Sequence, residues 1–166
     1  MSETLVPERQ ASLAWSDALL LELDFMDNTH REFVDLLAAV ETAHDEDLIE
    51  RFGALVDHTD AHFSGEDRWM AATQFASSNC HTMQHHVVMQ VLREALKRGH
   101  EGDLTLLRDL ARELGIWFTQ HAQSMDAALA LHLRKIGFDP VTGIVHCPDA
   151  LPDGEIHGCG GSSCSS

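Results

Sequence analysis

His62-Phe63-Ser64-Gly65-Glu66 places an imidazole and a carboxylate four residues apart within an amphipathic segment. At this spacing the two side chains share one face of a predicted helix. Apolar residues continue that face at spacings of three and four on both sides: Leu48, Phe52, Leu55 and Met70. A buried carboxylate without a partner is costly, so something must compensate it. A hydrogen bond between the two groups could do so, or a metal could, if other helices bring ligands to the same depth.

The whole chain has the size and composition of one soluble globular domain. Its 166 residues suffice for a full core, and 44% of them are hydrophobic. The formal net charge of -16 argues against nucleic acid and anionic membrane surfaces as partners, because both repel an acidic protein. No apolar run is long enough to span a bilayer, and residues 1–10 do not resemble a signal peptide. We therefore expect a cytoplasmic protein that binds neither nucleic acid nor membrane.

Four segments repeat apolar residues with the period of an α-helix. They cover approximately residues 23–44, 45–72, 81–99 and 104–136. Asp103 is the expected N-cap of the last segment, and Gly137 followed by Pro140 is a common way to end a helix. Short connections join the segments, so the sequence predicts an all-α fold, an antiparallel up-down-up-down four-helix bundle over residues 22–136.

The two ends of the chain lack this period. Residues 1–21 are expected to form an N-terminal arm in which Trp15 packs against the bundle. Residues 137–166 are rich in Gly, Ser, Pro, Asp and Cys, which predicts a flexible C-terminal tail, ordered at most to about residue 150. Three of the four cysteines lie in this tail without the Cys-x-x-Cys spacing of a zinc or redox module: Cys147, Cys159 and Cys164. A solvated tail is the plainest interpretation, and docking to a redox or protein partner stays open.

Polar groups on the apolar faces form the main functional signal. Because neighbouring helices run in opposite directions, counting residues from each connection brings seven such groups to the same end of the bundle. They are five imidazoles and two carboxylates: His30, His62, Glu66, His81, His85, His121 and Asp126. One histidine alone would be more simply a hydrogen-bonded core residue, but seven polar groups in one core require a shared partner. The number suits two metal ions, and the mixed donors suit first-row transition metals, iron among them.

Asp126 needs a separate explanation, because it follows His121 by five residues. On a regular α-helix that spacing separates two side chains by about 140°. Either the two side chains converge from neighbouring faces or the helix contains a local π-bulge, a feature often found at functional sites. Other histidines are expected at the bundle edge, in loops or on the surface: His44, His58, His86, His100 and His132.

The residues quoted so far resemble the hemerythrins in their bacterial single-domain form, over roughly residues 12–136. The resemblance includes Met26-Asp27-Asn28-Thr29-His30, the opening stretch with Met70, the pair His81 and His85, and the segment from Trp117 through His121 to Asp126. It implies two iron ions bridged by Glu66, Asp126 and a solvent-derived oxo or hydroxo group. By the same resemblance, His81, His85 and His121 would hold one iron, and His30 and His62 the other, which keeps an open position for dioxygen.

The resemblance also implies an apolar pocket around the irons, and one residue departs from the family pattern there. The implied lining residues are Phe33, Phe63, Trp117 and Phe118. The family usually has a bulky aliphatic residue directly after the histidine of the fourth helix, whereas this chain has Ala122. We therefore expect additional room beside the irons for water or a larger ligand.

The main hypothesis is a protein that binds dioxygen reversibly at a non-haem di-iron centre, for storage, delivery or sensing. Carboxylate-rich di-iron sites in other bundles use sets of Glu and Glu-x-x-His. Here only two of the seven donors are negative, which should stabilise the reduced iron pair and favour reversible binding. The alternatives are a di-iron enzyme that consumes peroxide or nitric oxide, and an iron storage or chaperone protein.

Overall fold

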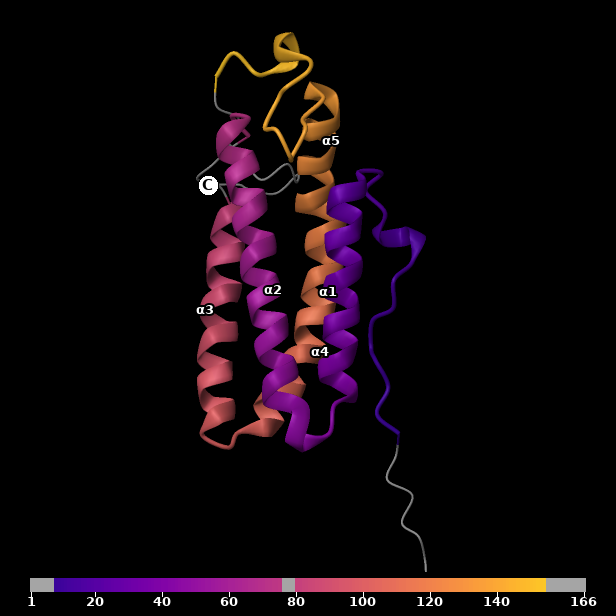
Figure 1. The fold of residues 1–166 in the computed structure, drawn as a ribbon, viewed down its shortest axis with the longest axis vertical. Helices are drawn as coiled ribbons and strands as arrows, with labels where there is room; N and C mark the ends of the chain where they lie inside the picture. The colour runs from indigo at the N-terminus through magenta and orange to yellow at the C-terminus, as the bar shows by residue number, and fades with distance from the viewer. Residues whose placement is uncertain (1–7, 76–79, 155–166) are drawn as a thin grey trace, which may run out of the picture.

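The protein is an all-α bundle of the predicted antiparallel type (Figure 1). The computed structural model describes residues 8–75 and 80–154. The long helices are α1 (Asp24–Thr42), α2 (Asp45–Ala72), α3 (Cys80–His100) and α4 (Leu104–His121). The last rod continues from α4 through a π-helical segment, η2 (Ala122–Asp126), into α5 (Ala127–Ile136). α1 packs against α2 and α4, and α3 packs against the same two helices.

Local sequence signals explain where several helices begin and end. The Asp103 side chain accepts a hydrogen bond from the Leu106 N–H at 3.2 Å, which confirms the predicted N-cap of α4. α5 ends at Gly137, whose φ of 59° is accessible to glycine without strain. The following N–H, of Phe138, then bonds to the Leu133 carbonyl at 3.0 Å. Among the described helices, none is long and apolar enough to cross a membrane.

A polar layer separates two apolar clusters within the bundle. The larger cluster includes Phe33, Leu37 and Phe52 and extends toward the α1–α2 connection. The smaller cluster surrounds α5 and includes the buried residues Met26, Met70, Leu129, Leu133 and Phe138. His30 lies between the two clusters on α1, Glu66 on α2, and Asp126 on the rod formed by α4 and α5. Apolar packing therefore seals the polar layer from both ends.

The segment before α1 packs along that helix as an extended arm with a short 3-10 turn, η1 (Asp17–Leu19) (Figure 1). The Glu41 carboxylate accepts hydrogen bonds from the Ser12 backbone N–H at 2.8 Å and from its hydroxyl at 2.5 Å. The Arg31 guanidinium lies 4.7 Å from the centre of the Trp15 ring. Residues 1–7 of the predicted arm lie outside the described residues.

The first half of the predicted tail folds back on the end of the bundle. The backbone N–H of Cys147 bonds to the Ile136 carbonyl at 2.9 Å, and an isolated bridge joins Phe138 to Val145. Phe138 is buried in the smaller cluster, 6.4 Å from the Trp69 ring. The composition of this segment predicts flexibility, but Phe138 and the apolar residues Val145, Ala150 and Leu151 pack against the smaller cluster. The remainder of the predicted tail, with Cys159 and Cys164, lies outside the described residues.

Asp27 holds the arm and the start of α1 together, one turn before His30. Its carboxylate accepts from the N–H groups of Leu21 at 2.8 Å and Leu23 at 3.2 Å. We expect Asp27→Ala to lower the free energy of unfolding by about 2–3 kcal/mol, because it leaves a buried N–H without a partner. Asp35→Ala, at an exposed position of the same helix, should change it by less than about 0.5 kcal/mol. Denaturant unfolding measures both, and equal effects would contradict this role of Asp27.

Candidate metal centre

All seven sequence-predicted donors come together in the polar layer. They are contributed by α1, α2, α3, α4 and η2, and all are buried, with exposed fractions of 0–6%. Their ligand atoms form two overlapping groups, in each of which the atoms lie within 4.8 Å of one another. One group is Glu66, His81, His85, His121 and Asp126; the other is His30, His62, Glu66 and Asp126. The two carboxylates therefore belong to both groups.

Each carboxylate divides its two oxygens between the groups. Glu66 Oε1 lies 3.0 Å from His62 Nε2, whereas its Oε2 lies 3.4 Å from the Nε2 atoms of both His81 and His85. Asp126 Oδ2 lies 3.2 Å from His30 Nε2. Its Oδ1 lies 3.0 Å from the Nε2 atoms of His81 and His121. This division is the one that a carboxylate needs to bridge two metal ions.

The π-helical segment η2 brings Asp126 to this position. A π-helix bonds residue i to residue i+5, so side chains five residues apart lie one turn apart on the same face. The 3.0 Å distance from His121 Nε2 to Asp126 Oδ1 shows that the two side chains face the same point. Of the two geometries that the spacing allows, the structure has the π-bulge.

The donor atoms fit a metal better than they fit one another. Several buried nitrogen and oxygen atoms lack hydrogen-bond geometry with any described residue, although imidazole and carboxylate atoms lie close by: His30 Nε2, His81 Nε2, Glu66 Oε2 and both carboxylate oxygens of Asp126. The Nε2 atoms of His85 and His121 lie only 3.1 Å apart. Buried polar atoms without hydrogen-bond geometry are costly in a protein interior, and a bound cation would remove that cost. Imidazole with carboxylate is a donor set for first-row transition metals.

The buried ionisable groups strongly shift one another's pKa values. Burial alone would lower the pKa of His30 and His81, but the carboxylates of Asp126 and Glu66 raise the pKa of His30 to about 10 and that of His81 to about 9. Burial would raise the pKa of both carboxyl groups, but the surrounding imidazoles hold the pKa of Glu66 and of Asp126 well below its usual range. In the metal-free protein, protonated imidazoles would therefore balance the charges of the two carboxylates.

Two residues that the sequence did not reveal orient the histidines of the larger group. Asp67 Oδ1 lies 2.8 Å from His85 Nδ1, and Gln84 Oε1 lies 3.1 Å from His121 Nδ1. An acceptor on Nδ1 keeps the proton there and turns the lone pair of Nε2 toward the centre. Asp67 directly follows Glu66, but adjacent residues on a helix point about 100° apart. Its contact with α3 depends on how the two helices are rotated, which periodicity does not show.

Aromatic side chains contact the donors, and they include the residues that the resemblance implies as a pocket lining. Phe63 stacks on the His85 ring at 4.0 Å, and Trp117 stacks on the His121 ring at 4.4 Å. Phe118 meets the His30 ring edge to face at 5.1 Å. Phe33 contacts Phe118 at 4.3 Å, and Ala122 is fully buried in the same cluster. These ring contacts fix the orientation of the imidazole planes.

Two of the other histidines differ from the prediction of loop or surface positions. His132 is buried in α5, where its Nε2 lies 3.1 Å from the Thr73 carbonyl and its ring stacks on Phe75. His58 lies within α2 and is only partly exposed, with its Nε2 3.1 Å from Glu32. Both occupy regular helix, so their burial depends on neighbouring helices rather than on local sequence. His44, His86 and His100 are exposed, as expected.

The fold and the donor set define a helical-bundle protein with a candidate metal centre of histidines and carboxylates. The family model described as Hemerythrin HHE cation binding domain matches residues 21–131, which include every donor. The chain is similar to the bacteriohemerythrin of Ralstonia nicotianae, with 37% identity over 127 residues that cover 76% of this chain and 93% of that protein. It is also similar to the bacteriohemerythrin of Stenotrophomonas maltophilia, with 26% identity over 141 residues, 80% of this chain and 92% of that protein. The chain belongs to the hemerythrin family.

The raised pKa values of His30 and His81 predict how the metal-free protein responds to pH. Their stabilising protons are fully present below the ordinary histidine value of 6.5 and are lost as pH rises through about 9 and 10. Stability should fall across this window, on the order of 1 kcal/mol per pH unit for each proton involved. Denaturant unfolding of chelator-treated protein measures this fall. His30→Gln should reduce the slope and exposed His86→Gln should not; equal slopes would contradict the assignment.

Proposed function

We propose that this protein binds dioxygen reversibly at a non-haem di-iron centre. The observation that carries the proposal is the division of both carboxylates between two histidine groups. His81, His85 and His121 would hold one iron, His30 and His62 would hold the other, and Glu66 and Asp126 would bridge the pair. The family and the names of the two bacteriohemerythrin relatives support the choice of iron and oxygen.

The charge of the donor set supports binding rather than oxidation chemistry. Two ferrous ions bring four positive charges, whereas five of the seven donors are neutral imidazoles. The iron pair, when bound, supplies the electrons that hold dioxygen. The histidine-rich set leaves net positive charge in a buried site, which stabilises the reduced ions relative to the oxidised ones.

The protein also makes the two sides of the centre unequal. One side has three imidazoles and the other has two, so the two-histidine side keeps a position for an external ligand. His30 on that side packs against Phe118, and both residues are fully buried. Where this apolar wall covers His30, it would limit contact with water and slow proton transfer, which would protect an oxygenated form from decay. Storage, delivery or sensing of oxygen would each rely on this same reversible binding step.

Iron content and the optical spectrum test this proposal directly. Protein purified from iron-replete cells should contain about two irons per chain. Its reduced form should gain an absorption band on exposure to oxygen and lose it again on removal of oxygen, over repeated cycles. One zinc per chain without iron would refute the iron assignment. Catalytic consumption of peroxide or nitric oxide without reversible oxygenation would favour the enzyme alternative, and accumulation of many irons would favour storage.

A matched pair of variants separates the bridging role from a general effect of substitution. Glu66→Ala removes a bridging charge from the buried centre, so it should lose iron and stability together. His86→Ala alters an exposed histidine next to His85 and should keep nearly normal iron content. If His86→Ala empties the centre and Glu66→Ala does not, the assigned donor set is wrong.

Ala122 sets the lifetime of the oxygenated form in this proposal. A larger side chain at this buried position would displace water and protons from the centre, so Ala122→Ile should slow autoxidation. The decay of the oxygenated absorption band measures the rate for both proteins under matched conditions. Ala122→Val adds less volume and should give an intermediate rate, and thermal unfolding should be followed because overpacking costs about 1–3 kcal/mol. Equal lifetimes for all three proteins would mean that the neighbouring side chains already close the site.

A further inference from the structure

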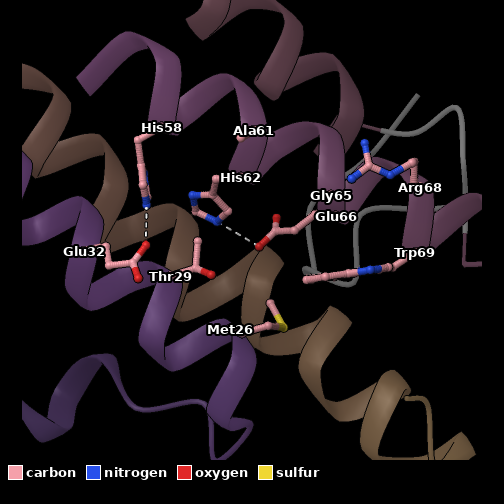
Figure 2. A pocket seen from close by; sticks show the side chains of 10 residues that line it. All are labelled: Met26, Thr29, Glu32, His58, Ala61, His62, Gly65, Glu66, Arg68 and Trp69. Atoms are coloured by element: carbon pink, nitrogen blue, oxygen red, sulfur yellow. Dashed lines mark hydrogen bonds and ion pairs between the residues drawn. The ribbon is translucent and has the colours of Figure 1, made fainter. Parts of the chain in front are cut away.

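A pocket on the outer face of α1 and α2 reaches the two-histidine side of the centre (Figure 2). Its volume is about 270 Å³, far more than the roughly 10–15 Å³ that a single water needs. Two of its lining residues, His62 and Glu66, are donors of the candidate metal centre. His62 is also the most exposed of the seven donors, at 6% against 0–2% for the others.

The histidine at the base of the pocket has an unpartnered nitrogen. His62 Nε2 lies 3.0 Å from Glu66 Oε1, whereas its Nδ1 is buried and has no hydrogen-bond partner among the described residues. Figure 2 shows this second nitrogen on the side of the ring that faces His58. By contrast, the Nδ1 atoms of His85 and His121 face Asp67 and Gln84. The described residues therefore leave this nitrogen of His62 without a polar contact, in a side chain that also lines the pocket.

The lining is polar where it meets solvent and apolar beside the donors. Glu32 and His58 form a pair at 3.1 Å on one side of the pocket, and Arg68 lies on the other (Figure 2). Met26 and Trp69 provide the apolar part. Arg68 is the lining residue with a permanent positive charge, and the chain as a whole carries a net charge of -16. Because Glu32 and Glu66 belong to the same lining, the attraction for a small anion would come from cations bound at the proposed centre together with Arg68, and not from Arg68 alone.

We propose that the α1–α2 pocket is the polar access route by which small anions and water reach the two-histidine side of the metal centre. The proposal rests on the proposed di-iron centre, and it concerns the path rather than the final binding position. Narrowing an access path slows the binding and the release of a ligand by the same factor, so the dissociation constant stays unchanged. Changing the position at which the ligand binds alters the dissociation constant instead.

Gly65 gives a way to narrow the route from within. It lines the pocket, and a Cβ added there would meet its nearest atoms, on Arg68 and Trp69, at 3.9 Å, which is ordinary contact. Gly65→Leu should therefore fold and fill part of the pocket. Gly53 is a matched control on the same helix, because a Cβ added there meets nothing within 4 Å and the residue does not line the pocket. Ala61→Leu narrows the same pocket from an exposed position one helical turn before Gly65.

The first measurement is the rate of azide binding to, and release from, the oxidised iron-loaded protein by stopped-flow absorption. Gly65→Leu and Ala61→Leu should each slow both rates by roughly tenfold with an unchanged dissociation constant. Gly53→Leu should leave both rates unchanged. Rates within twofold of the unsubstituted protein for both pocket variants would overturn the proposal, as would a changed dissociation constant with one rate unaffected.

The second measurement uses the metal-free protein and does not depend on iron. In a background of Trp15→Phe and Trp117→Phe, iodide that enters the pocket should quench the fluorescence of Trp69. Ala61→Leu should reduce the quenching constant by about twofold, whereas Gly53→Leu should not change it. Equal quenching in all variants would overturn the proposed route. Absence of any azide complex in the unsubstituted protein would refute the proposed centre instead, and the quenching result would still decide whether anions enter the pocket.

Discussion

The charge of two buried carboxylates is the constraint on which the rest of this structure depends. Glu66 and Asp126 are at most 1% exposed, and neither has a lysine or arginine partner among the described residues. Their charge has to be balanced by imidazolium protons or by bound cations, because an isolated buried charge is far more costly than a paired one. Metal binding and folding are therefore linked: the same donors that compete for protons in the metal-free protein become ligands once cations replace those protons.

The bundle satisfies this constraint by interrupting its own helical regularity at one place. A regular α-helix through η2 would turn Asp126 away from His121 and leave one carboxylate outside the layer. The inserted π-turn retains both side chains on one face, and the 3.0 Å distance between their ligand atoms is the result. The apolar clusters on either side of the layer supply the stability that allows this local irregularity. The irregular turn thus lies at the candidate metal centre and is supported by ordinary apolar packing on either side.

The sequence predicted the bundle and the seven donors because both are visible as spacings along single helices. His62 and Glu66, or His81 and His85, share a face whatever the neighbouring helices do. Asp67 and Gln84 could not be found in this way, because their contacts with His85 and His121 depend on how helices are rotated against one another. The burial of His132 against Thr73 and the return of Phe138 to the bundle end have the same cause. Periodicity shows patterns within one helix, but it leaves the contacts between helices undetermined.

The contacts between elements also explain why the two sides of the centre differ. His85 and His121 on the three-histidine side have Asp67 and Gln84 behind their rings, so their orientation is fixed by the protein. His30 and His62 on the other side have Nδ1 atoms without such partners among the described residues, and His62 borders the α1–α2 pocket. In the proposed centre, fewer ligands and weaker restraint on this side would allow an external ligand to bind there with little rearrangement of the protein. The three-histidine side of the proposed centre would meanwhile hold its ion firmly, so that ligand exchange at one ion would not release the other.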